Sequence, residues 1–320
     1  MSAKPRSIWV VVLAGGDGQR LRAATTHARG VSAPMQYCSL NGARSLLQIS
    51  LRRALAVTSR EHIVTVVAEA HRPWWEREFT APSRSPVIVE PCNRGTGLEV
   101  LLPLLVIAKS DPEASVVFIP SDHDVEHEDL LAEYLREATA PAVMDSDKLT
   151  LLGMPPNAPD SGFGYLSPAP DSGVGMRPVP EFVENPHQAL AAELIRAGSA
   201  WNSGIMAGRI SQFIELYSRH AREMLADLRA IVAHWPDSRV PSAELAAWYA
   251  RHPAFDFTSD MLQKFPRSLQ LLSVPPTFDR AVFRSEPAPG SMIHSSHAQF
   301  GQGSFVPVAR FPRLSPYDES

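Results

Sequence analysis

The first half of the chain alternates short apolar runs with longer segments of helical spacing. Four runs rich in β-branched residues predict strands, at residues 8–14, 62–68, 87–91 and 115–121. Between them, residues 45–57 and 97–110 carry apolar side chains at the spacing of a helix. Nearly continuous apolar strands separated by helices predict a parallel sheet with helices on both faces.

The second half has a more mixed pattern. Strands are predicted at residues 148–154, 181–186 and 200–206, with a turn at 162–166 that leads into an extended piece. Helical spacing predicts a helix over 187–198 and helical structure over 210–235. Residues 284–320 are rich in proline, serine and glycine and lack periodicity, which predicts that most of this tail is loosely ordered.

Composition narrows the class of protein. With 320 residues, 44% of them hydrophobic, the chain can bury a full core as one large domain or two. The formal net charge of -4 gives no support for binding nucleic acid. Two cysteines, Cys38 and Cys92, provide no disulfide framework. Residues 1–7 are too short and polar for a signal peptide, and no apolar run is long enough to span a membrane, so we expect a soluble cytoplasmic protein.

Candidate chemistry follows two of the predicted strands. Residues 8–14 run into a glycine loop, Gly15–Arg20, where backbone N–H groups can approach a phosphate and an arginine adds charge. The same glycines also suit a plain tight turn. Residues 115–121 run into Asp122 and His123, and ligands of parallel sheets bind at the carboxyl ends of the strands.

Three further segments complete a recognisable order: EPCNRGTG (90–97), FVENP (182–186) and WNSG (201–204). Taken together, residues 7–283 resemble the sugar-nucleotide pyrophosphorylases, which are nucleotidyltransferases, and most closely their mannose-1-phosphate guanylyltransferase branch. The resemblance implies an α/β fold with a Rossmann-like, doubly wound, mostly parallel but mixed sheet of the glycosyltransferase-A-like type.

The resemblance also implies how the chain is organised and what it does. Residues 1–283 would form a nucleotidyltransferase-like domain, with a nucleotide-binding part at about 7–147 and a sugar-phosphate-binding part at about 148–283. The reaction would join GTP and mannose 1-phosphate, or a related sugar 1-phosphate, into GDP-mannose and pyrophosphate with Mg²⁺. Its substrates would be small molecules, its partners neither nucleic acid nor membrane, and a homodimer is possible.

Site residues carry over position by position. Arg20 would neutralise the departing pyrophosphate and Asp122 would bind the metal, which makes these two the catalytic candidates. Asp279 is the candidate for a second metal aspartate, and Asp124 is the nearest rival to Asp122. The nucleotide would contact Leu13, Ala14, Gly15, Gly16, Gly18, Arg20, Asn93, Arg94, Gly95 and Thr96. The sugar phosphate would contact Gly164, Glu184, Asn185 and Asn202.

Two positions depart from the pattern of this family. Relatives carry lysines at the phosphates where this chain has Met35 and Asn185. Methionine has no charge, and asparagine cannot neutralise a phosphate. Arg22, Arg29 and Arg177 are the candidates to compensate. Three hypotheses therefore stay open: an active enzyme, a catalytically impaired homologue that binds a nucleotide sugar as a regulatory or partner subunit, and a nucleotidyltransferase with another donor or acceptor.

Overall fold

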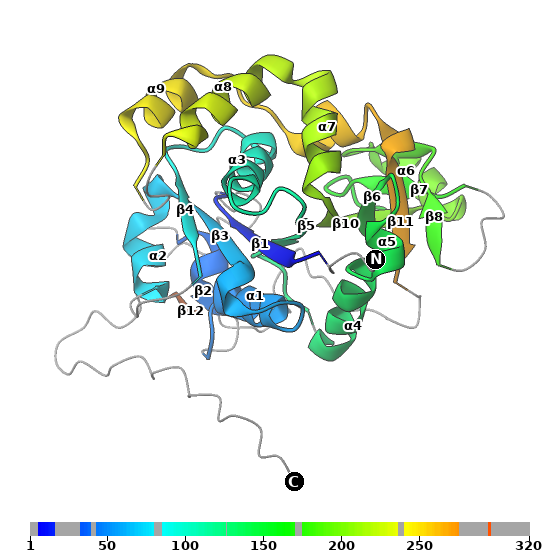
Figure 1. Cartoon of the computed structure of the whole chain (residues 1–320). Helices are drawn as coiled ribbons and strands as arrows, with labels where there is room; N and C mark the ends of the chain where they lie inside the picture. Colours follow the sequence, from blue (N-terminus) through cyan, green and yellow to red (C-terminus); the bar gives the residue numbers. More distant parts are fainter. Residues whose placement is uncertain are drawn as a thin grey trace, which may run out of the picture.

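The computed structural model describes residues 6–16, 33–39, 43–79, 85–125, 127–169, 175–235, 240–274 and 294–295. A ten-stranded mixed sheet forms its centre, in the order β4-β3-β1-β5-β10-β6-β11-β8, with β7 and β9 attached through β10 (Figure 1). The strands of this sheet are β1 (Ile8–Ala14), β3 (Ile63–Ala68), β4 (Val87–Glu90), β5 (Ser115–Pro120), β6 (Leu149–Met154), β7 (Tyr165–Ser167), β8 (Met176–Pro178), β9 (Glu181–Val183), β10 (Ala200–Arg209) and β11 (Leu269–Ser273). The predicted α/β fold with a mostly parallel, mixed sheet is confirmed.

Four strands form the parallel part, and all four were predicted from their apolar runs. β1 pairs in parallel with β3 and with β5, and β3 pairs in parallel with β4. Leu13 of β1 stands opposite Pro120 of β5. The carboxyl ends of the two central strands therefore lie side by side, which brings the glycine loop next to Asp122.

Helices cover both faces of the sheet (Figure 1). Successive residues of its parallel strands are buried on opposite faces, so both faces must be covered. Val11 and Phe118 face one core and Val10 and Val117 face the other. The first core is covered by α3 (Thr96–Ala108), α7 (Ile210–His220), α8 (Arg222–Ala233) and α9 (Ala243–Arg251). The second is covered by α1 (Leu46–Leu55), α2 (Arg72–Glu78), α4 (Glu128–Ala138), α5 (Pro141–Met144) and α6 (Gln188–Arg196).

The second half of the sheet changes direction. β10 is antiparallel to both β5 and β6, and its register with β6 shifts between Asn202 and Met206. Gly204 lies within this bulge with a φ of 73°, a backbone conformation that glycine adopts without strain. β11 then pairs in parallel with β6, and β8 closes this side in antiparallel fashion.

The helical stretch predicted over 210–235 forms two helices, α7 and α8. Ala221, with φ -144° and ψ 47°, leaves the helical region and separates α7 from α8. Each helix buries its own apolar stripe, including Phe213 in α7 and Leu228 in α8. The pattern resembled one helix because neither proline nor glycine stands at the break.

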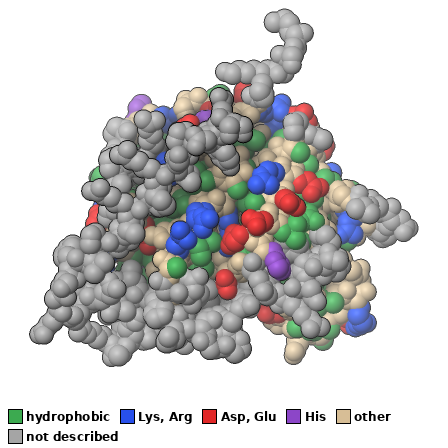
Figure 2. Space-filling view, turned by 90° about the horizontal axis from the view of Figure 1, so that it is seen from below, with side chains coloured by type: hydrophobic (Ala, Val, Ile, Leu, Met, Phe, Trp, Pro, Cys, Tyr) green, Lys and Arg blue, Asp and Glu red, His purple; other side chains and the backbone are tan. Residues whose placement is uncertain are grey.

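Within the predicted tail, the described residues form one short strand. β12 (His294–Ser295) pairs antiparallel with β2 (Cys38–Ser39), which follows a short 3₁₀ turn at Met35–Tyr37. The rest of the tail lies outside the described residues. The described helices include none both long and apolar enough to cross a bilayer. Seen from below, the described surface shows acidic and basic side chains next to each other between apolar ones, so this face carries mixed charge (Figure 2).

Candidate functional site

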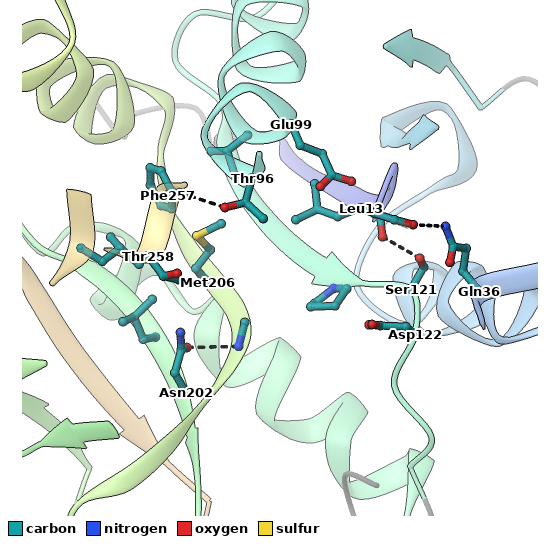
Figure 3. Close-up of a pocket in the computed structure, with 16 residues that line it drawn as sticks. Leu13, Gln36, Thr96, Glu99, Ser121, Asp122, Asn202, Met206, Phe257 and Thr258 are labelled. Carbon is teal, nitrogen blue, oxygen red and sulfur yellow. Dashed lines mark hydrogen bonds between the residues drawn. The ribbon is translucent and has the colours of Figure 1, made fainter. Parts of the chain in front are cut away.

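A cavity of about 220 Å³ opens where β1 and β5 end, and β10 and the segment 257–262 form its opposite wall (Figure 3). Residues from the first half of the chain that line it are Leu13, Gly16, Gln36, Thr96, Glu99, Val100, Pro120, Ser121 and Asp122. Those from the second half are Leu151, Asn202, Gly204, Met206, Phe257, Thr258 and Leu262. The cavity thus brings together both predicted parts of the site.

The end of β1 is fixed by side chains from two neighbouring segments. The Leu13 carbonyl accepts hydrogen bonds from the Ser121 hydroxyl at 2.6 Å and from the Ser121 backbone N–H at 3.1 Å. The Gln36 amide donates to the carbonyls of Ala14 and Gly16, both at 2.9 Å. These bonds hold the start of the glycine loop open toward the cavity.

The Gly15 N–H was expected to approach a phosphate, but it donates to the Glu99 carboxylate at 2.8 Å. A β-carbon at Gly15 would lie 2.9 Å from Glu90 Oε2 and 3.1 Å from Glu99 Oε1, so a larger residue would require these carboxylates to shift. Tyr249 donates to the other Glu90 oxygen at 2.9 Å. Burial raises the pKa of the Glu90 carboxyl, and the negative charge of Glu99 raises it further.

Asp122 lies directly after β5 and points its carboxylate at the cavity (Figure 3). Its side chain is 55% exposed, and His123 Nε2 lies 4.0 Å from its carboxylate. The buried Arg53 of α1 braces this loop, because its guanidinium donates to the His123 carbonyl at 3.0 Å and to Glu128 at 2.6 Å. Asp124, the predicted rival, does not line the cavity.

Residues 93–96 mostly make hydrogen bonds that stabilise the fold. Asn93 accepts from the Gly95 N–H at 2.9 Å, and the Arg94 guanidinium donates to the Tyr249 and Ala250 carbonyls. Thr96 alone of this segment reaches the cavity. Its hydroxyl donates to Asp256 at 2.8 Å and accepts from the Phe257 N–H at 2.8 Å, which joins the start of α3 to the opposite wall.

The predicted sugar-side residues lie in or beside three strands: Gly164 precedes β7, Glu184 and Asn185 follow β9, and Asn202 is in β10. Asn202 lines the cavity, and its backbone N–H donates to the Gly164 carbonyl at 2.7 Å. A β-carbon at Gly164 would lie 2.3 Å from Glu184 Oε2 and 2.6 Å from the Phe182 ring, so these side chains pack directly over this glycine. Glu184 and the exposed Asn185 are not among the lining residues. Trp201 is buried and stacks on Phe163.

The positions that depart from the family's lysines do not line the cavity. Met35 is 4% exposed in its 3₁₀ turn. Asn185 adopts a left-handed φ of 48°. Arg177 donates to Ser273 at 2.5 Å, at the β8 side of the sheet. Gly18, Arg20, Arg22, Arg29 and Asp279 lie outside the described residues.

Sequence reasoning missed several residues of this site. Glu99 carried one usable signal, because it is the only charged residue in the apolar helix α3. Arg53 and Gln36 carried no such signal, because the sequence alone does not distinguish a buried arginine or glutamine from an exposed one. The wall at 257–262 was missed because it forms a π-helical turn, Thr258–Leu262, a conformation that hydrophobic periodicity does not predict.

The described side chains fit a magnesium ion held mainly by its substrate. Mg²⁺ keeps several waters and uses one or two carboxylates together with phosphate oxygens. Asp122 supplies one such carboxylate at the cavity. The described residues contain no group of three or more acidic, histidine or cysteine side chains that would form an all-protein metal cage. Asp122 is thus the described residue suited to hold the ion.

A mixed sheet whose parallel strands end at a two-sided cavity defines an α/β protein of the Rossmann-like type. The chain belongs to the nucleotidyl transferase family, whose sequence model matches residues 9–248. The predicted resemblance to nucleotidyltransferases is therefore confirmed.

Curated relatives point to the same branch. The chain is 30% identical over 215 residues to the alginate biosynthesis protein AlgA of Pseudomonas syringae pv. tomato, which covers 66% of this chain and 43% of that protein. It is 28% identical over 232 residues to a mannose-1-phosphate guanylyltransferase of Sinorhizobium fredii, covering 69% of this chain and 43% of that one. The match thus spans less than half the length of these relatives.

A solved structure shares the fold. The crystal structure titled mannose-1-phosphate geranyltransferase, from Thermus thermophilus, superposes with a TM-score of 0.70 at 24% identity, covering 83% of this chain and 74% of that one. At this identity the likeness shows the architecture alone.

Proposed function

We propose that the chain transfers a nucleoside monophosphate from a nucleoside triphosphate to a sugar 1-phosphate, with GTP and mannose 1-phosphate as substrates. The observation that carries this proposal is the single cavity in which Asp122 and Asn202 lie on opposite walls, beside the start of the glycine loop (Figure 3). Membership of the nucleotidyl transferase family and the names of its relatives support it.

In the proposed reaction, an oxygen of the sugar 1-phosphate attacks the α-phosphorus of the nucleotide. A new P–O bond forms, the bond to the β-phosphate breaks, and pyrophosphate leaves. Catalysis of this kind depends mainly on positioning and on charge stabilisation. Asp122 would hold Mg²⁺, which supplies positive charge at the phosphates. Arg20 is proposed to neutralise the leaving group, and Gly164, Glu184 and Asn202 to position the sugar.

Pyrophosphate release tests the proposal directly. The full chain is incubated with Mg²⁺ and each pairing of four nucleoside triphosphates with mannose, glucose and fucose 1-phosphates. We expect the largest kcat/KM for GTP with mannose 1-phosphate. Release no faster than without protein, for every pair, contradicts the proposal. Release with another pair keeps the reaction class and corrects the substrates.

A second function, a regulatory subunit without turnover, is favoured by one observation. Met35 and Asn185 stand where relatives have phosphate-binding lysines, and no described residue that lines the cavity supplies a positive charge in their place. The only charged side chains among the described lining residues are those of Glu99 and Asp122. The double variant Met35→Lys, Asn185→Lys separates the two functions. A wild type that is inactive, together with turnover in the double variant, supports the regulatory subunit.

We also propose that the protein acts in the cytoplasm as a homodimer. Sedimentation equilibrium of the full chain tests the oligomeric state, and a mass of one chain across the concentration range contradicts the dimer. Fractionation of the cells that produce it tests the location.

A further inference from the structure

The carboxylate of Glu99 marks one end of the cavity. Glu99 lies in the first turn of α3, is 7% exposed and lines the cavity. Figure 3 shows its carboxylate reaching from α3 toward the end of β1, beside Leu13. There it accepts the Gly15 N–H at 2.8 Å. A buried charge at this position requires a role, because removing a carboxylate from water is costly.

Three titratable groups lie around Glu99. Glu90 of β4 also lies against Gly15, and burial together with the charge of Glu99 raises its pKa. Burial and the charges of Glu78 and Glu99 raise the pKa of the Tyr37 hydroxyl, and burial together with Glu90 and Glu99 raises the pKa of the Tyr249 hydroxyl. A charge-assisted bond from Gly15 stabilises the Glu99 carboxylate itself.

The arrangement of charges along the cavity indicates which way a bound nucleotide would lie. A phosphate at the Gly15 amide would meet the negative charge of Glu99, so the phosphates belong at the Asp122 end. Asn202 occupies the wall assigned to the sugar phosphate. What remains is the space beside α3, where Leu13 and Val100 offer apolar surface to a planar ring and Glu99 stands at their edge.

We propose that Glu99 selects the base of the nucleotide by accepting its N–H donors, and this inference rests on the proposed function. A carboxylate offers acceptors only, with about four lone-pair positions on its two oxygens. Guanine presents two adjacent donors, N1–H and the 2-amino group. Hypoxanthine lacks the amino group, xanthine places a carbonyl there, and uracil has one N–H between two carbonyls. Glu99 therefore favours guanine over all three.

Binding of nucleoside diphosphates tests this inference without requiring turnover. Calorimetry with Mg²⁺ compares GDP, IDP, XDP and UDP on the full chain. A polar group that pairs with a buried charge discriminates by about tenfold or more. We expect the wild type to bind GDP at least about tenfold more tightly than IDP, and more tightly still than XDP and UDP.

Two isosteric variants test whether the preference for GDP over IDP comes from one carboxylate. Glu99→Gln is expected to bring the GDP-to-IDP ratio close to one, because it replaces a charged double acceptor with a neutral amide. Glu90→Gln is the matched control, because Glu90 also lies against Gly15 but does not line the cavity, and it is expected to keep the ratio. Loss of the ratio in Glu90→Gln alone overturns the inference. If Glu99→Gln does not fold, the wild-type series still decides, since equal binding of GDP, IDP and UDP also overturns it.

The outcomes separate this inference from the proposed function. Binding of nucleotides without a preference for guanine contradicts the role of Glu99 and leaves nucleotidyl transfer standing. No binding of any nucleotide contradicts both. A preference for guanine without pyrophosphate release supports Glu99 and favours the regulatory subunit.

Discussion

The two walls of the cavity are built in different ways. The wall at β1 and β5 uses the carboxyl ends of parallel strands: Leu13 is in β1, and Gly16 and Asp122 lie just after β1 and β5. The opposite wall uses the middle of the antiparallel β10, where a bulge turns Asn202 and Met206 toward the cavity, and a π-helical turn. Regular geometry positions the first wall, and local irregularity positions the second.

The largest effect should come from the first wall. Asp122→Asn removes the carboxylate that would hold Mg²⁺, and we expect kcat to fall by on the order of 10²–10³. Steady-state pyrophosphate release measures it, with circular dichroism to check folding. Asp124→Asn is the matched control, because that side chain does not line the cavity. An equal loss in both variants would show that charge in this loop, and not the Asp122 carboxylate, is what matters.

Two glycines sharpen the comparison: Gly16 lines the first wall, and the Gly164 carbonyl accepts the backbone N–H of Asn202 in the second. Gly164→Ala places a β-carbon 2.6 Å from the buried Phe182 ring, which cannot move aside as the Glu184 carboxylate can. We expect a loss of about 1–3 kcal/mol in the free energy of unfolding and a raised KM for the sugar phosphate. In Gly16→Ala the new carbon meets none of the described residues within 4 Å, so stability should change by less than about 0.5 kcal/mol. Denaturant titration compares them, and similar losses would contradict the packing over Gly164.

The buried carboxyl of Glu90, which lies against Gly15, predicts that the stability of the protein depends on pH. The pKa of Glu90 is raised in the folded protein by burial and by Glu99, above its ordinary value of 4.5. The folded state then holds a proton that the unfolded chain has lost, so stability falls as the pH rises through 4.5 toward the folded pKa. Glu90→Gln should remove up to about 1.4 kcal/mol per pH unit of this slope. Unfolding by denaturant from about pH 5 to about pH 8 measures it, and parallel slopes in the two proteins would contradict the assignment.

The smallest effect concerns the bond between the walls. Thr96→Val removes the hydroxyl that joins Asp256 and the Phe257 N–H, and we expect a loss of about 1 kcal/mol in unfolding free energy. Thr139→Val is the control, since its hydroxyl bonds only locally to the Arg136 carbonyl at the end of α4. Thermal melts at equal protein concentration compare them. A control that loses more than Thr96→Val would speak against a special role for this bond.

The same difference explains what could be predicted from the sequence. The four parallel strands and Asp122 followed from apolar runs and from the rule that ligands bind where such strands end. The second wall depends on backbone features that leave no periodic signal, namely the bulge at Gly204 and the π-helical turn Thr258–Leu262. Glu99 could have been suspected as a lone charge in an apolar helix, but its contact with Gly15 joins residues 84 positions apart, which only the fold reveals.

The bond between Thr96 and Phe257 links residues 161 positions apart in the chain. On a ribosome, the first wall is therefore synthesised long before the segment that closes the cavity. No small molecule can be enclosed, or lend its binding energy to folding, until that late segment has emerged. The nascent chain must therefore fold its parallel half without help from a ligand, and ligand binding can stabilise only the complete protein.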